Sequence, residues 1–489
     1  MSDQNVRPNK YGELRNKYKY YIDLYNALYQ LKTEKEEELK KIYKKIQTEL
    51  IDSKRFLPQR IVEDILNIIP CNNRYTKSYL SLAKFICDDY HVKEINRINP
   101  ISNFFFYKEY GIKLDKSCDF EKINTEELDI LTTDTIYRAI MNNDLKRLIS
   151  FTEREGFDKD KELYNKLYQC PTYNLSYLDL CCYYGAIDCF KFLRTKFNSE
   201  ITRVSLEFSF LGGNPDIMSE CLKYQKPDMW CMIYAIISHN IDFVTFLMNE
   251  YNLDVKINNC PKFKNLESLF VYFDKTNDIN NCFAYSAMFN IPSLCEYFLS
   301  LGADIHAIND DGQTALFGAA SNNSYETAKF LLSQGADTNE KNRIEMTALH
   351  ISAKNNYKEL VKLLISHGAN VDEKTPDGRT PLHLAIKNNC TETIELLLSL
   401  GANINEKNIC GTTVIHTAAY QCRKEIAEVL ISHGANINEK GDNGKPVLHE
   451  AAYNNSTETA ELLISHGIDI NEKDNDGQTA LHIATDIDN

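Results

Sequence analysis

The sequence predicts an all-α solenoid of stacked helix pairs joined by short β-hairpin fingers, with a helical region at its N-terminal end. Two periodic patterns carry this prediction. A threonine recurs every 33 residues from Thr314 to Thr479, with Pro446 once in its place, and a histidine usually follows three residues later. A glycine recurs with the same spacing from Gly302 to Gly467. A fixed period of this length is typical of repeat proteins, whose units bury their apolar faces only against their neighbours.

One unit, residues 375–407, shows how such a helix pair forms. Gly378 supplies the positive φ of a tight turn, and Thr380 caps the next helix, with Pro381 in its first turn. Apolar residues then recur at helical spacing in two stretches, which are separated by an Asn-Asn pair that tolerates left-handed backbone. Gly401 ends the second stretch. Each unit is therefore expected to contain two short helices and one finger.

The phrase Thr-Pro-Leu-His-Leu-Ala at residues 380–385 recurs in part in every unit. With its 33-residue period, this part of the chain resembles the ankyrin-repeat family. The resemblance implies that the recurring histidines interlock the turns of neighbouring units and are not metal ligands. These histidines are His350, His383, His416, His449 and His482.

Three regions are expected along the chain. Residues 1–130 form a helical N-terminal region, residues 131–275 contain degenerate ankyrin-like helix pairs, and residues 276–489 contain the 33-residue repeats, the last of them half complete. The breaks between paired helices are predicted at Asn143, Gly185, Gly212, His239, Asn290 and Asn323. Two consecutive steps of 27 residues predict a stack almost without fingers over residues 185–245, and a step of 51 predicts an extra helix at residues 266–273.

Residues from about 55 to 300 also resemble a domain of unknown function that precedes ankyrin arrays in a large protozoan protein family. The resemblance rests on three sequence motifs, at residues 136–144, 210–216 and 286–293. It implies no activity.

Apolar spacing predicts several helices in the N-terminal region. One follows the stripe Leu39, Ile42, Tyr43, Ile46 and Leu50. Others are expected at residues 58–69, between two prolines, and at residues 79–86. The aromatic residues 104–107 are expected to form a buried cluster under a short helix.

Composition excludes several classes of protein. A net charge of −14 and a pI near 5.4 argue against a general nucleic-acid binder. No apolar run approaches the ~20 residues that cross a bilayer, and no hydrophobic signal segment opens the sequence. We therefore expect a cytoplasmic or nuclear protein that is not secreted. The 15 cysteines include no Cys-x-x-Cys pair and are expected to be reduced, buried thiols.

No motif indicates catalysis. Residues 474–477 resemble part of a calcium loop, but Ile483 stands where the ligand glutamate is required. The glycines before Lys445 are too closely spaced for a phosphate-binding loop. The sequence therefore predicts no catalytic residue, no cofactor, no metal site and no enzyme.

The function that remains is recognition of a protein partner. We expect it on the concave face that the fingers and inner helices form. The resemblance to ankyrin repeats places the candidate contacts at the finger tips and at the ends of the inner helices. These candidates are Arg343, Ile344, Met346, Arg379, Ile409 and Lys445 in the fingers, and Lys354, Lys387, Tyr420 and Tyr453 on the inner helices. Apolar finger tips are explained equally well by binding and by neutral drift.

The predicted function is that of an intracellular scaffold or adaptor for protein–protein interaction, acting as a monomer on a partner of unknown identity. The alternative is a substrate receptor of a ubiquitin ligase, because residues 57–69 weakly resemble the start of an F-box. Burial of the helix at residues 58–69 would favour the scaffold.

Overall fold

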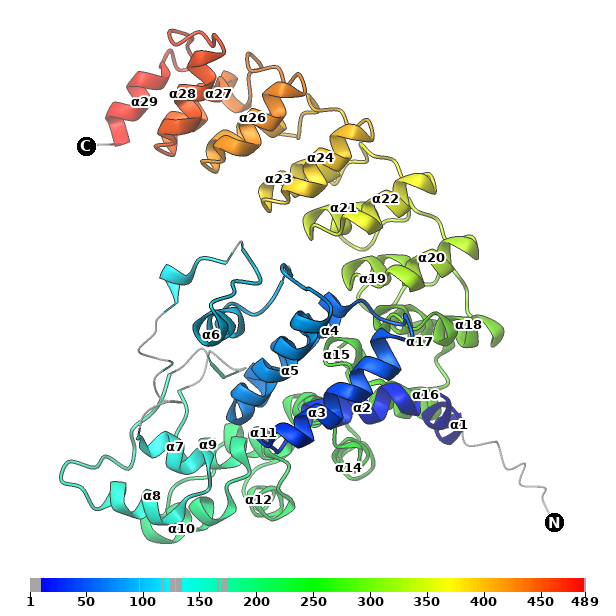
Figure 1. Cartoon of the computed structure of the whole chain (residues 1–489), viewed down its shortest axis with the longest axis vertical. Coiled ribbons are helices and arrows are strands. Elements are labelled where there is room, and N and C mark those ends of the chain that lie inside the picture. Colours follow the sequence, from blue (N-terminus) through cyan, green and yellow to red (C-terminus); the bar gives the residue numbers. More distant parts are fainter. Residues whose placement is uncertain are drawn as a thin grey trace. The chain divides into compact units, whose positions relative to one another are not determined.

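The computed structural model describes residues 10–95, 97–116, 118–123, 128, 134–164, 167–168 and 174–487. Residues 1–277 form one compact unit, unit 1, and residues 278–489 form a second, unit 2. Helices make up nearly all of the regular structure in the described residues (Figure 1), which confirms the predicted all-α solenoid. The predicted boundary between residues 130 and 131 lies outside the described residues.

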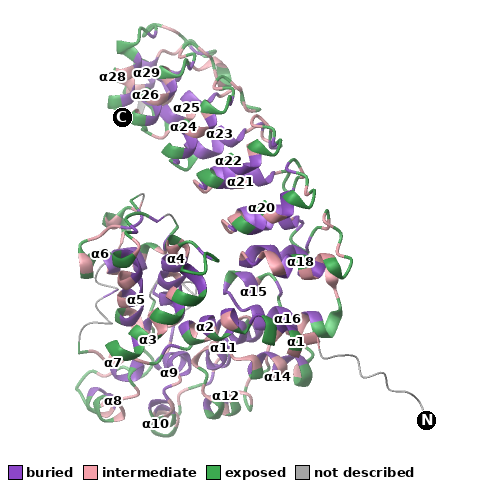
Figure 2. Ribbon diagram, turned by 45° about the vertical axis from the view of Figure 1, so that its right-hand side comes forward, coloured by how far each residue is buried: buried purple, intermediate pink, exposed green. Residues whose placement is uncertain are grey.

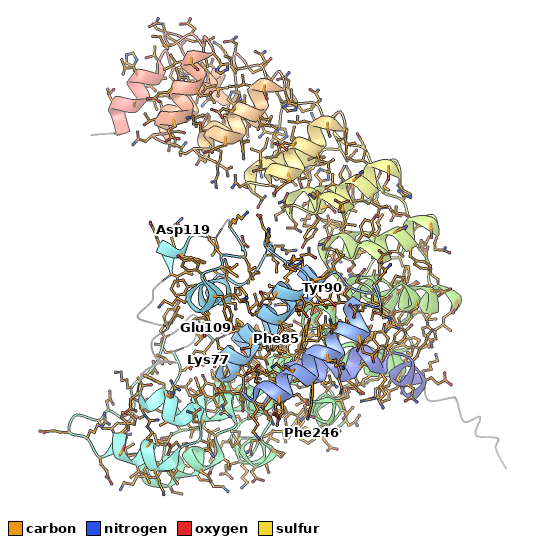
Figure 3. All side chains as sticks on the ribbon, in the orientation of Figure 1. Lys77, Phe85, Tyr90, Glu109, Asp119 and Phe246 are labelled. Carbon is orange, nitrogen blue, oxygen red and sulfur yellow. The ribbon has the colours of Figure 1, made fainter. Side chains whose placement is uncertain are left out.

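Unit 1 begins with a group of helices. They are α1 (Lys10–Lys17), α2 (Lys19–Tyr29), α3 (Glu36–Ile46), the π-helical turn η1 (Gln47–Ile51), α4 (Pro58–Ile68), the 3-10 turns η2 (Ile69–Cys71) and η3 (Asn73–Tyr75), α5 (Thr76–Asp89), α6 (Pro100–Tyr110) and the 3-10 turn η4 (Phe120–Lys122). Leu39, Ile46 and Leu50 of the predicted stripe are buried. Helix α5 packs beside α3, where the rings of Phe85 and Tyr43 lie 5.6 Å apart; Figure 3 labels Phe85 on α5.

The aromatic cluster at residues 104–107 was predicted wrongly. These residues lie within α6 itself, and not under a helix. Phe104 and Phe106 are buried, whereas the side chain of Tyr107 is 44% exposed. Four consecutive residues of an α-helix turn around its whole circumference, so they cannot share one buried face.

Five helix pairs follow in unit 1. They are α7 (Ile136–Met141) with α8 (Leu145–Thr152), α9 (Tyr177–Tyr184) with α10 (Ile187–Phe197), α11 (Arg203–Gly212) with α12 (Pro215–Cys221), α13 (Met229–Ile237) with α14 (Ile241–Tyr251), and α15 (Asn259–Lys262) with α16 (Leu266–Thr276). The first helices of successive pairs stack on one another, from α7 through α9 and α11 to α13 and α15. Only residues 198–202 connect α10 to α11, which leaves no room for a finger.

One predicted break needs correction, and one further break was not predicted. The left-handed residue after α11 is Gly213, and Gly212 is the last residue of that helix. Lys264 is also left-handed, with φ of 57°, so the step of 51 residues contains a further pair. The predicted extra helix at residues 266–273 is the second helix of this pair. Lysine rarely adopts left-handed backbone, and this is why the sequence did not show the break.

Unit 2 continues the same design. Its helices are α17 (Ile279–Ser286), the 3-10 turn η6 (Ala287–Phe289), α18 (Pro292–Ser300), α19 (Ala315–Ser321), α20 (Tyr325–Ser333), α21 (Ala348–Lys354), α22 (Lys358–Ser366), α23 (Pro381–Lys387), α24 (Thr391–Ser399), α25 (Val414–Tyr420), α26 (Lys424–Ser432), the 3-10 turn η7 (Asp442–Gly444), α27 (Val447–Tyr453), α28 (Thr457–Ser465) and α29 (Ala480–Ile487). First helices stack on first helices, from α19 to α29, and Figure 2 shows their facing sides as buried.

Each predicted finger is closed by the same hydrogen bond across its turn. The amide of Asn342 donates to the carbonyl of Met346 at 2.9 Å, and equivalent bonds begin at positions 309, 375, 408, 441 and 474. Neighbouring fingers are joined as well. The amide of Arg343 donates to Gly312, and the amide of Ile409 donates to Asp377. Within each such pair, the two finger tips are therefore fixed relative to each other.

Two of the recurring histidines, His350 and His449, interlock the repeats as predicted. Nδ1 of His350 accepts the backbone N–H of Thr347 at 3.2 Å, and its Nε2 donates to the carbonyl of Arg379 in the next finger. Nε2 of His449 donates to the carbonyl of Gln478 at 2.9 Å in the same way. Burial lowers the pKa of His350 to about 4, so the ring is neutral in the folded protein.

We expect helix α29 to be the least protected first helix of unit 2. It packs on α27, but among the described residues no second helix covers it, and Leu481 is 71% exposed. Local opening is easiest where few apolar contacts must break. Amide hydrogen exchange in α29 should therefore be faster than in α23, where Leu382 is fully buried. Equal protection of the two helices would contradict this assignment.

Candidate functional site

The candidate contacts in the fingers lie at the turns. Ile344 is 63% exposed, Arg343 is also exposed, and both lie in the turn that Asn342 and Met346 close. Met346 itself is half-buried, and its carbonyl closes the turn, so it offers less surface to a partner than Arg343 or Ile344.

The next finger tips are held by close backbone contact. Ile409 is 72% exposed, and a Cβ added at Gly378 would lie 2.7 Å from its backbone nitrogen. Glycine at position 378 therefore allows two fingers to approach each other closely. The large exposed side chain of Ile409 has no packing role in unit 2, which is the property expected of a contact residue.

Two cationic finger residues already have partners. The guanidinium of Arg379 lies 3.1 Å from the carboxylate of Asp377 in the same finger. The ammonium group of Lys445 lies 5.9 Å from the centre of the Tyr453 ring on α27. Lys445 and Tyr453 thus join a finger to an inner helix, and they are the two predicted residues that a direct contact brings together.

The inner-helix candidates occupy one repeated position. Lys354, Lys387, Tyr420 and Tyr453 are the last residues of α21, α23, α25 and α27, and Ser321 ends α19. Tyr420 is 52% and Tyr453 is 54% exposed, and both lysines are exposed. We call these four residues, with Arg343, Ile344, Arg379, Ile409 and Lys445, the strip. Because their helices and fingers stack in sequence order, they follow the repeats in two rows.

A ladder of ion pairs beside the strip was not predicted. Each of four lysines meets a glutamate one repeat further along, in the pairs Lys341–Glu373, Lys374–Glu406, Lys407–Glu439 and Lys440–Glu472, at 2.6–2.9 Å. The nearby ammonium groups lower the pKa of Glu373, Glu406 and Glu439. The signal was present in the repeated Glu-Lys endings of the units, because residues 33 apart are neighbours in a stack.

The cysteines follow the prediction in part. Among the described residues most are buried, but Cys410 and Cys422 are exposed. Within that same part of the chain, no group of three His, Cys, Asp or Glu could hold a metal ion, and no helix is long and apolar enough to span a membrane.

One carboxyl group of unit 1, that of Glu207, has a pKa well above its ordinary value. Burial raises its pKa to about 7, and Arg203 lies 2.8 Å from it. Glu207 lies on α11 inside the stack of first helices and lines none of the cavities of unit 1 found among the described residues. Its environment is that of a structural ion pair.

Comparison with known families identifies ankyrin repeats in this chain. The model for ankyrin repeats, in three copies, matches residues 262–342, 283–375, 339–408 and 415–488. A domain of unknown function, DUF3447, matches residues 197–272, which include the motif at 210–216 but not those at 136–144 and 286–293. Neither description names an enzyme.

No curated protein matches the chain. Among solved structures, the ankyrin repeat domain of Bcl-3, described as a unique member of the IkappaB protein family, is similar. The two share 24% sequence identity with a TM-score of 0.39, over 41% of this chain and 92% of that chain.

Proposed function

We propose that this protein is an intracellular scaffold or adaptor, in the cytoplasm or nucleus, that binds a partner protein with the strip on its ankyrin repeats. One observation carries the proposal. Large side chains at the strip, such as Ile409 and Tyr420, are more than half exposed, whereas apolar residues between the stacked helices, such as Leu382, are fully buried. Exposed aromatic and arginine side chains on a rigid support are typical of protein interfaces.

The stacked repeats would hold the side chains of the strip on a rigid backbone. Backbone hydrogen bonds join the fingers in pairs, and His350 and His449 each join a first helix to the next finger. A partner would therefore meet side chains that are already positioned, and binding would cost little ordering of the backbone. In the proposed function, the protein acts as a monomer and does not bind nucleic acid.

The burial of α4 favours the scaffold over a ubiquitin-ligase receptor. Ile61, Val62, Ile65 and Leu66 of α4 are at most 1% exposed, and the helix packs against α2, α5 and α6 within unit 1. An F-box-like helix would need surface that is open to a ligase subunit. Leu57, just before the helix, is 61% exposed, and it alone offers little area.

We expect Arg343→Ala combined with Tyr420→Ala to weaken partner capture at least about tenfold, because truncation of central aromatic and arginine contacts typically costs ~2 kcal/mol or more. Both side chains are exposed, so the melting temperature should stay nearly unchanged. Capture is measured by pull-down with the full-length protein and quantitative mass spectrometry. The matched control is Lys362→Ala with Ile464→Ala, which removes one cation and one exposed apolar side chain from the second helices. Loss of capture in the control, but not in the double variant, would place the site elsewhere.

A further inference from the structure

The inner-helix positions of the strip have counterparts in unit 1. Lys354 and Tyr420 each lie two residues before the left-handed residue that ends their helix, Asn356 and Cys422. The same position in the degenerate pairs of unit 1 is occupied by Met141, Tyr183, Leu211, Ile237 and Lys262. Tyr183 is 4% and Ile237 is 2% exposed, in contrast with 52% for Tyr420. In unit 1 the position is buried at Met141, Tyr183 and Ile237, but it is partly exposed at Leu211 and exposed at Lys262. In unit 2 it is exposed at the four inner-helix residues of the strip.

N-terminal segments of the same chain lie against this position at Tyr183 and near it at Ile237. The hydroxyl of Tyr183 donates to the backbone carbonyl of Pro70 at 2.7 Å. Ile237 lines a cavity of about 220 Å³ together with Tyr29 and Arg74, which come from the N-terminal segments. The position is thus a docking position within this molecule. The segments that lie against it present the aromatic ring of Tyr29 and the backbone carbonyl of Pro70, which accepts from Tyr183.

The same position in unit 2 carries a different charge. Lys354 and Lys387 end two successive inner helices, and Arg343 lies in the finger between α20 and α21. Among the described residues, none of these three cations has a carboxylate within ion-pair distance, whereas the neighbouring ladder lysines are paired.

The acidic finger residues near these cations are already engaged. Asp310 accepts from the amide of Asn281, Asp311 accepts from the hydroxyl of Tyr285, and Asp377 is paired with Arg379. Asp310 and Asp311 keep their negative charge in these hydrogen bonds, because both donors are neutral. The charged groups of the strip without an ion-pair partner among the described residues are cations, among them Arg343, Lys354 and Lys387, although the whole chain has a net charge of −14. Charge complementarity then selects an acidic partner surface.

We infer that the strip binds an acidic segment of the partner protein in which carboxylates flank aromatic or aliphatic side chains. The carboxylates lie against Arg343, Lys354 and Lys387, and the apolar side chains lie against Tyr420 and Tyr453. A backbone carbonyl of the segment accepts from a tyrosine hydroxyl, as Pro70 does from Tyr183 in unit 1. This inference rests on the function proposed above and adds the chemical class of the segment that is bound.

Synthetic peptides test this class directly on the full-length protein. The probe is a fluorescent 16-residue peptide of glutamates with a phenylalanine at every fourth position, and fluorescence anisotropy measures its binding. In one control peptide lysine replaces each glutamate, and in another serine replaces each phenylalanine. We expect each control peptide to bind at least about tenfold more weakly, a difference of 1.4 kcal/mol.

Charge reversal on the protein gives the matched comparison. Lys354→Glu with Lys387→Glu should weaken the acidic probe at least about tenfold and strengthen the lysine peptide. Lys358→Glu with Lys362→Glu makes the same change in net charge on the exposed face of α22 and should leave the probe unaffected. Circular dichroism confirms that both variants fold.

Three results would overturn the inference. One is the absence of binding by the acidic probe, another is equal weakening by both charge reversals, and the third is equal affinity for the probe and for a single-stranded oligonucleotide of the same charge. If any of these results is found while Arg343→Ala with Tyr420→Ala still weakens partner capture, the proposed function stands. Only the inference that the bound segment is acidic is then wrong. Failure of both experiments would remove the proposed function as well.

Discussion

Lowering the pH from about 6.5 to about 4 should unfold unit 2. Burial lowers the pKa of His350, His383 and His416 from 6.5 to about 4. In each ring Nδ1 accepts a backbone N–H of the preceding cap, as His383 does from Thr380 at 3.3 Å, so protonation there would break the cap. The three imidazoles are therefore neutral in the folded repeats.

The direction of the effect follows from these pKa values. Because the folded pKa lies below the unfolded pKa, the unfolded chain takes up protons first as the pH falls. The stabilisation is complete above about pH 6.5, is lost progressively toward pH 4, and amounts to about 3 kcal/mol for each histidine. Three histidines remove roughly 10 kcal/mol, which is comparable with the ~5–15 kcal/mol stability of a whole domain.

Urea titrations followed by circular dichroism between pH 7.5 and pH 4 measure this dependence. His383→Gln should be less stable at pH 7.5, since it loses the cap hydrogen bond. Its free energy of unfolding should also fall less steeply with acid, by up to ~1.4 kcal/mol per pH unit between pH 6 and pH 4.5. An unchanged slope in this variant would show that His383 is not a neutral buried ring.

Gly212→Ala should prevent unit 1 from folding normally, although alanine is the better helix former. A Cβ at position 212 would lie 2.0 Å from the carbonyl oxygen of Cys182 and 2.7 Å from the nitrogen of Gly185. These are backbone atoms of the neighbouring first helix, so relief requires α9 and α11 to separate. Overpacking a core costs ~1–3 kcal/mol when side chains can adjust, and we expect more here because they cannot.

Gly213→Ala is the matched control for this substitution. Position 213 has a φ of 69°, and an added Cβ would meet nothing within 4 Å. It should cost only the ~1–2 kcal/mol of left-handed backbone. Fluorescence of Trp230, the one tryptophan of the chain, follows unit 1 because it lies on α13. If Gly212→Ala and Gly213→Ala shift the Trp230 transition equally, α9 and α11 do not approach as closely as described.

The two adjacent glycines also show what a sequence pattern can and cannot predict. The repeat period, the capped helices and the interlocking histidines all follow from residues within one unit or 33 residues apart. The first two predictions are confirmed, and the third is confirmed at His350 and His449. Gly212 and Gly213 both suit a break between helices, and only the distance to Cys182, in another helix, separates their roles. Lys264 gave no signal for a break, because lysine has no preference for left-handed backbone.

In the candidate site, too, some features could be predicted from the repeat pattern and others could not. The exposure of Ile344, Ile409 and Tyr420 could be predicted, because a fixed place in the repeat decides it. The pairing of Arg379 with Asp377 and the half-burial of Met346 depend on how one finger folds, and the period carries no information about them. The cover over Tyr183 comes from residues more than 100 positions away, which no local pattern can reveal.

Photocrosslinking decides whether the strip contacts the partner protein. A benzoylphenylalanine placed at position 344, 420 or 453 of the full-length protein replaces an exposed side chain on the strip, and one at position 362, 428 or 464 replaces an exposed side chain on a second helix. We predict that irradiation joins the same partner to all three strip positions and to none of the second-helix positions. Crosslinks to that partner from positions 362, 428 and 464, without any from 344, 420 and 453, would contradict the proposed binding face.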